Sequence, residues 1–74
     1  MARKKRRPIH ARIVELRERA ELTQAQLAEI IGVGRDVVWH WENGDSAPRA
    51  SRLPDLADAL GVDVDTLLRD LVAA

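Results

Sequence analysis

The sequence predicts an all-α fold, a compact five-helix domain behind a disordered basic N-terminal arm. Three observations support this prediction. Apolar residues recur at helical spacing in five successive segments, glycine or proline separates each segment after the second from the one before it, and the apolar set is Leu, Ile, Val and Ala with two Trp and no Phe or Tyr. The 74 residues suit one domain, and the chain has no cysteine, so apolar packing and helix caps must stabilise it.

The first eight residues form the predicted arm, and residues 9–74 form the domain. The arm has no apolar period and repels itself, which predicts disorder in the free protein. The formal net charge of zero hides an uneven distribution, because the acidic side chains gather towards the C-terminus. Charge of one sign at one end predicts a polyanionic partner there, met by Arg3, Lys4, Lys5, Arg6 and Arg7. The arm is either a solubilising tail or, as this charge favours, a segment that follows the phosphate backbone or a minor groove of DNA.

The first two helices follow from apolar spacing and caps. The first is predicted from about Ile9 to Ala20, with one face lined by Ile9, Ile13, Leu16 and Ala20. The second starts after Thr23, whose spacing from Gln26 predicts a capping box, and it ends at Gly32. Its predicted buried side consists of Leu27, Ala28, Ile30 and Ile31.

The third helix is predicted over residues 35–43, between Gly34 as a weak N-cap and Gly44, with Val38 and Trp41 facing inward. A loop marked by Pro48 follows. The fourth helix is predicted from Ser51, as its N-cap, to Leu60, with Pro54 in the first turn. The fifth starts after Asp63, as N-cap, and its apolar face is Val64, Leu67, Leu68 and Leu71.

Residues 23–44 carry the functional prediction. Ala28 is small enough for a close crossing, Gly32 permits a tight turn, and the next helix is anchored by Val33, Val38 and Trp41. This combination predicts two short helices packed at a steep angle, the geometry that lets a second helix enter the major groove of DNA.

Four short segments lie between about Ile9 and Leu71: LTQAQLAEIIGV, WENG, AP and LADALGVD. Together they resemble the Cro and phage-repressor type of helix-turn-helix protein, also called the xenobiotic-response-element family. The resemblance implies five helices, with the third reading the major groove and an ion pair between Arg17 and Glu42. The chain departs from the family pattern at Glu21 and Gly34, where Gly and Ser are common, and at the bulky Trp39.

Several residues are candidate DNA contacts, each with an ordinary structural alternative. Arg35 either pairs with guanine or is solvated, Asp36 either accepts from cytosine or stabilises the helix dipole, and Val37 either touches a thymine methyl or borders the core. Trp39 either stacks along the sugar edge of the DNA, covers a partner subunit or folds back over the third helix. The predicted base or groove set is Gly34, Arg35, Asp36, Val37, Trp39 and His40, and the predicted phosphate set is Gln24, Asn43 and the basic arm residues.

The last helix is more apolar than one small core requires. It either closes the domain or forms a twofold dimer contact through Leu67, Leu68, Leu71 and Val72. The sequence therefore predicts a cytoplasmic, homodimeric regulator that binds double-stranded DNA, most simply a repressor. The alternative is a protein-interaction module such as an antitoxin-like partner. No enzyme motif, metal-ligand spacing, cofactor fingerprint, small-molecule effector site or membrane-length apolar run is evident.

Overall fold

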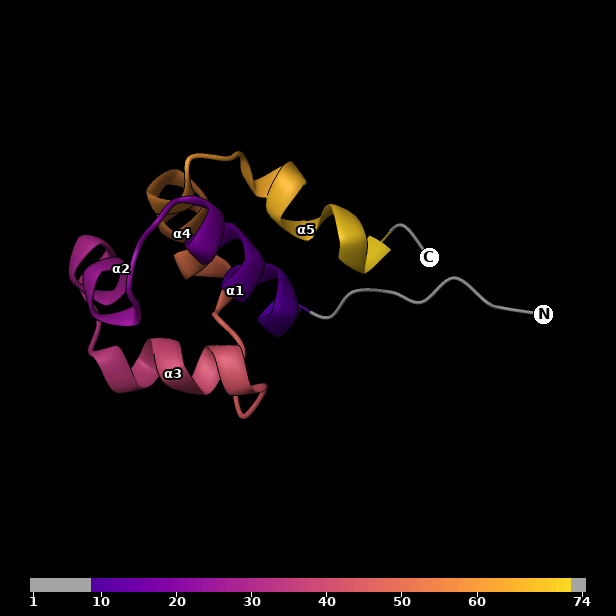
Figure 1. Cartoon of the computed structure of the whole chain (residues 1–74). Helices are drawn as coiled ribbons and strands as arrows, with labels where there is room; N and C mark the ends of the chain where they lie inside the picture. Colours follow the sequence, from indigo (N-terminus) through magenta and orange to yellow (C-terminus); the bar gives the residue numbers. More distant parts are fainter. Residues whose placement is uncertain (1–8, 73–74) are drawn as a thin grey trace.

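The computed structural model describes the backbone of residues 9–72 and the side chains of residues 9–68. Within that range the elements follow one another as helices joined by short turns (Figure 1). They are α1 (Ile9–Arg19), α2 (Gln24–Ile31), α3 (Arg35–Asn43), a 3-10 turn η1 (Ala50–Arg52), α4 (Leu53–Leu60) and α5 (Val64–Val72). The predicted all-α class and five helices are confirmed for this part of the chain.

Helix α1 lies between the two halves of the domain. It contacts α3 on one side and α5 on the other, while α2 bridges α3 and α4. In Figure 1, α3 forms the edge of the domain farthest from α4 and α5. One side of α3 is therefore free of other elements among the described residues, and this position makes it available to a partner.

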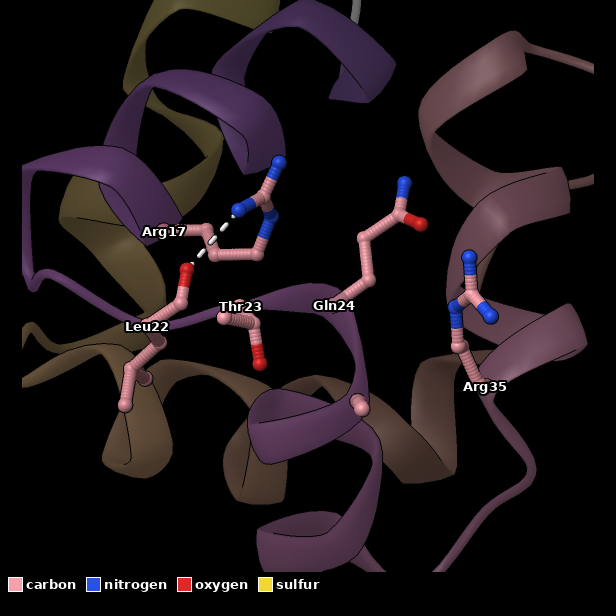
Figure 2. Close-up of a pocket in the computed structure, with 6 residues that line it drawn as sticks. Arg17, Leu22, Thr23, Gln24 and Arg35 are labelled. Carbon is pink, nitrogen blue, oxygen red and sulfur yellow. Dashed lines mark hydrogen bonds between the residues drawn. The ribbon is translucent and has the colours of Figure 1, made fainter.

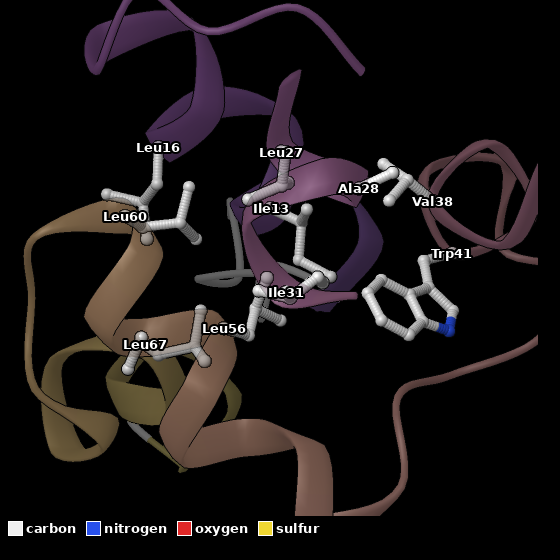
Figure 3. Packing of buried hydrophobic residues seen from close by; sticks show 11 residues of the cluster. Ile13, Leu16, Leu27, Ala28, Ile31, Val38, Trp41, Leu56, Leu60 and Leu67 are labelled. Atoms are coloured by element: carbon white, nitrogen blue, oxygen red, sulfur yellow. The ribbon is translucent and has the colours of Figure 1, made fainter. Parts of the chain in front are cut away.

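The core lies where α1, α2, α4 and α5 meet and extends to the inner side of α3 (Figure 3). Leucine and isoleucine fill most of it, and the indole of Trp41 closes it beneath α3. Burying each such side chain contributes about 1.5–3 kcal/mol. The buried residues are Ile13, Leu16, Leu27, Ala28, Ile31, Val38, Trp41, Leu56, Ala57, Leu60 and Leu67.

The predicted caps of α2 and α5 are confirmed. The Thr23 hydroxyl accepts a hydrogen bond from the Gln26 amide at 3.0 Å, and the Gln26 side chain accepts from the Thr23 amide at 2.8 Å. Gly32 takes the left-handed conformation that ends α2, with φ of 79°. At α5, the Asp63 carboxylate accepts from the Thr66 amide at 2.7 Å. Hydrogen bonds between residues three positions apart therefore fix where α2 and α5 begin.

Two local predictions are wrong. Ser51 is not the N-cap of α4, because a 3-10 turn occupies Ala50–Arg52 and α4 begins at Leu53 without a side-chain cap. Ile30 is not buried but 57% exposed. On a helical wheel Ile30 lies about 100° from the centre of the stripe formed by Leu27 and its buried neighbours, so it projects to the side of this stripe and into solvent.

Two further predictions from α1 and α5 are corrected. Ala20 is exposed because α1 ends at Arg19, one residue earlier than predicted. Leu67 is fully buried within a single chain, which removes it from the predicted dimer contact and places it in the core. Leu68 is partly buried against that core, and the side chains of Leu71 and Val72 lie outside the described residues.

The turn between α1 and α2 keeps a left-handed residue without glycine. Glu21 has φ of 62°, a conformation that costs a residue with a Cβ about 1–2 kcal/mol. Its amide bonds the Glu18 carbonyl, and the next amide, of Leu22, bonds the Arg17 carbonyl. The departure at Glu21 therefore leaves a strained turn.

Candidate nucleic-acid interface

The angle between α2 and α3 is fixed by the turn at Gly32. The amides of Gly32 and Val33 both bond the carbonyl of Ala28, at 2.9 and 3.0 Å. Ala28 itself is 2% exposed, and Val38 from α3 is completely buried. Figure 3 shows the side chains of Ala28 and Val38 meeting between the two helices. A small residue, a left-handed glycine and an apolar anchor therefore hold α3 across α2, as predicted.

Glu42 joins three helices from the inner side of α3. Its carboxylate accepts from Arg17 of α1 at two points, Nε at 2.5 Å and Nη2 at 3.0 Å, and from Gln24 Nε2 of α2 at 2.9 Å. The Glu42 side chain is 5% exposed and that of Arg17 14% exposed. The ion pair that the resemblance implied is confirmed, and it fixes α3 against both neighbouring helices.

Arg17 is committed to this structural role. The hydrogen bond that Arg17 donates to Glu42 raises the pKa of Arg17 above its ordinary value, against the opposing effect of burial. Its third nitrogen donates to the carbonyl of Leu22 at 2.8 Å, at the entry to α2. One guanidinium thereby connects α3 with the turn that contains the strained Glu21.

The opposite side of α3 is open to solvent. Arg35, Asp36, Trp39, His40 and Asn43 are all exposed, and they fall on a single helical face. Val37 lies outside this face, because it is partly buried and packs against the core. Of the two roles predicted for Val37, the structure places it at the edge of the core.

Two hollows adjoin this face and share Arg35. One is lined by Arg35, Asp36 and Trp39. The other lies at the start of α2, where Figure 2 shows the Gln24 and Arg35 side chains facing each other across the gap, with Arg17 on the α1 side. A helix N-terminus with nearby cations is a favourable place for a phosphate. Arg35 therefore lies between a hollow suited to an anion and the outward face of α3.

The outward side chains make few internal bonds. His40 Nδ1 lies 3.0 Å from the Asp45 carboxylate, and Asn43 Nδ2 donates to the Trp39 carbonyl at 2.8 Å. Gly34 begins α3 without a side-chain cap, so the first amides of α3 receive no side-chain oxygen from this position. The predicted base-contact residues other than Val37 are thus brought together on one exposed surface.

The predicted phosphate contacts are placed less uniformly. Gln24 lies at the start of α2 but gives one amide hydrogen to Glu42, and the Asn43 side chain is turned back on its own helix. The basic arm from Arg3 to Arg7 lies outside the described residues. The predictions for these residues remain predictions.

Sequence reasoning missed Arg49 and Arg52. Both line a hollow beside Val37, formed partly by the loop after α3, and Arg49 is exposed. Arg52 also donates to the Ile31 carbonyl at 3.3 Å, which satisfies the C-terminal end of α2. The sequence signal that could have identified this site is the basic residue Arg49 in the loop that follows the third helix.

The described residues contain neither a membrane-spanning helix nor a metal-binding cluster. No helix between residues 9 and 72 is long and apolar enough to span a membrane. No group of three or more His, Asp or Glu side chains within the described range is arranged to hold a metal ion.

Comparison with known proteins assigns the family. A family model described as a helix-turn-helix domain matches residues 11–71, so the chain belongs to the helix-turn-helix domain family. The cryptic phage CTXphi transcriptional repressor RstR of Vibrio cholerae serotype O1 is 34% identical over 59 residues, which are 80% of this chain and 53% of that protein. The chain therefore spans about half the length of this curated relative.

Solved structures of DNA-bound regulators agree with this family. The P22 c2 repressor, in complex with a synthetic operator, matches with a TM-score of 0.79 and 28% identity over 86% of this chain and 97% of that chain. The biofilm regulator SinR, in complex with DNA, matches with a TM-score of 0.76 and 29% identity over 82% of this chain and 98% of that one. The resemblance seen in the sequence is confirmed.

Proposed function

We propose that this chain is a sequence-specific, double-stranded DNA-binding transcriptional regulator, most simply a repressor, with α3 in the major groove. One observation carries the proposal. The inner side of α3 is fixed by Val38, Trp41 and Glu42, while its outer side presents charged and aromatic groups to solvent. A rigid helix with an open polar face is what groove recognition requires.

The contacts divide by chemistry. Arg35 and Asp36 offer a donor and an acceptor to base edges, and His40 extends the same face. The start of α2 at Gln24, the loop after Asn43 and the basic residues of the arm meet the phosphate backbone. These phosphate contacts position the domain and supply affinity that depends on salt.

We further propose that the regulator acts as a homodimer, because a palindromic operator has two half-sites and each half-site binds one subunit. Leu68 is partly exposed on α5, and Leu71 and Val72 follow on the same helix. A twofold contact there would set the half-sites about 34–36 Å apart, close to one turn of DNA. Leu67 takes no part in this contact, because it is buried in the core of its own chain.

The test is selection of bound duplexes from a random pool, followed by fluorescence-anisotropy titration of the selected duplex. Affinity should fall by about 10³-fold or more between about 50 and 200 mM salt if six or more phosphates are contacted. Affinity that is independent of salt would contradict the phosphate contacts. A selection that yields no preferred sequence would contradict specific readout.

Arg35→Ala separates base reading from backbone binding. We expect it to lose about 1–3 kcal/mol of discrimination at one base pair, with a smaller loss on unrelated DNA. Arg49→Ala is the matched control, because this exposed arginine lies in the loop and should weaken binding to all sequences equally. The same uniform loss from Arg35→Ala would exclude Arg35 from base readout.

A further inference from the structure

Trp39 has an exposed indole that the fold does not use. It is 44% exposed, whereas Val38, one residue before it, and Trp41, two residues after it, are 0% and 4% exposed. A single exposed apolar side chain needs no special explanation. This one, however, lies near the middle of the outward face of α3, where a bound duplex would cover it.

The hollow beside the indole combines three kinds of surface. Arg35 supplies hydrogen-bond donors, Asp36 supplies acceptors, and Trp39 supplies an apolar wall. A phosphate in this hollow would meet the Asp36 carboxylate at close range, and like charges repel. Base edges in the major groove carry the complementary groups, namely guanine acceptors, amino donors and the thymine C5-methyl. The hollow therefore fits bases and not the DNA backbone.

The indole is supported from behind. The ring of His40 packs edge-on against it, with centroids 5.0 Å apart and an interplanar angle of 85°. His40 Nδ1 is in turn 3.0 Å from the Asp45 carboxylate. These contacts reduce the rotational freedom that binding would otherwise have to remove.

Trp39 is also the large apolar side chain that α3 exposes to solvent, and thus the one that can contact a base. Val37, the other apolar candidate, is partly buried and packs against the core. Arg35 lies one helical turn before Trp39, and residues four apart share a face. An arginine contact to guanine would thus place the indole against a neighbouring base pair.

We propose that Trp39 reads the C5-methyl group of a thymine in the base pair next to the one that Arg35 contacts. This inference rests on the DNA binding proposed above. It assigns Trp39 to base specificity, in place of the sugar edge, a partner subunit or its own helix.

The experiment uses the whole chain and the duplex selected from a random pool. Each thymine is replaced in turn by deoxyuridine, which removes the methyl group and keeps the base pairing. We expect one replacement per half-site to weaken wild-type binding by about fourfold, the factor for one buried methyl-sized group. Trp39→Ala should bind the thymine and uracil duplexes with equal affinity.

Ile30→Ala is the matched control. Ile30 is the other large apolar side chain that is exposed among the described residues, at 57%, and it lies on α2. This variant should keep the wild-type preference for thymine over uracil. Thermal unfolding of Trp39→Ala, followed by circular dichroism, checks that the variant remains folded.

The outcomes separate this inference from the proposed function. Wild-type protein that binds no duplex specifically overturns both. Specific binding without any thymine-to-uracil effect, or with an effect that Trp39→Ala retains, overturns the thymine contact alone. A Trp39→Ala chain that binds both duplexes as the wild type does, but no longer self-associates, would place the indole in a protein interface and also overturn it.

Discussion

The two sides of α3 contain two tryptophans that differ tenfold in exposure. Trp41 is 4% exposed and closes the core, whereas Trp39, two residues earlier, is 44% exposed and faces solvent. Glu42 and Asn43 show the same division: the Glu42 carboxylate is held by two other helices, and the Asn43 amide bonds only its own helix. Packing against the other helices and exposure to solvent are thus assigned to opposite sides of one nine-residue helix.

This separation has a functional reason. A side chain that must fix the orientation of α3 needs partners inside the protein, and a side chain that contacts DNA needs to be free of them. Because successive residues of a helix point about 100° apart, neighbours in sequence can serve the two purposes independently. Substitutions on the two sides should therefore affect different measurements.

The largest expected effect is at Trp41. Trp41→Ala should lower the free energy of unfolding by about 3–5 kcal/mol, because it leaves a cavity under α3. That is a large share of the stability of a domain of this size. Trp39→Ala should change the same quantity by less than about 0.5 kcal/mol. Urea denaturation of both variants measures the difference, and equal losses would contradict the division between the two sides.

A smaller loss is expected at Glu42. Glu42→Ala leaves the partly buried Arg17 guanidinium and the Gln24 amide without their acceptor, which should cost about 3 kcal/mol. Asn43→Ala, the neighbouring outward substitution, should cost less than about 1 kcal/mol. Chemical denaturation of the pair tests whether the inner side alone orients α3.

The pH dependence of this contribution follows from Arg17. Since the hydrogen bond to Glu42 raises the pKa of Arg17, the stabilisation from the arginine is fully present below its ordinary pKa. It is lost only as the pH rises through the raised value, far above neutrality. The difference in stability between Glu42→Ala and the wild type should therefore stay constant between about pH 7 and pH 9. A steady decline over that window would show that another group titrates with the pair.

The smallest effect is expected in the turn before α2, away from both sides of α3. Glu21→Gly relieves a left-handed conformation at φ 62°, partly offset by the greater entropy of glycine in the unfolded chain. The net gain should be about 0.5–1 kcal/mol, seen as a higher midpoint of thermal unfolding. DNA affinity should not change. A change in affinity without a change in stability would mean that this turn itself touches the ligand.

Local chemistry made much of the fold predictable. Thr23 and Gln26, Gly32, and Asp63 act on backbone groups within a few residues, so their spacing alone located the helix ends. The prediction at Ser51 failed for the same local reason, since a 3-10 turn competes with an α-helical start over three residues. The prediction at Ile30 failed because the apolar character of a residue does not show whether another helix covers it. Ile30 lies at the edge of the apolar stripe of α2, and it is exposed.

The candidate site was predictable as a segment but not as a set of roles. Residues 23–44 were recognisable from the small residue, the glycine turn and the apolar anchors. The position of Val37 at the core edge, the bond between Gln24 and Glu42, and the hollow shared by Arg35 and Trp39 required the packed helices. The first two depend on residues brought together from different helices. The hollow is lined by residues of α3 alone, and it stays open because no other described element covers that side of α3.

The sequence by itself determined where the helices lie, how most of them begin and end, and which face of α3 is apolar, because these depend on interactions within one or two turns. The tertiary structure decided that Leu67 closes the core instead of a dimer and that Ile30 stays exposed. It also decided that Trp39 stands beside Arg35 and Asp36 on an open surface. Burial and exposure are properties of the packed whole, since they depend on which neighbouring element covers each residue.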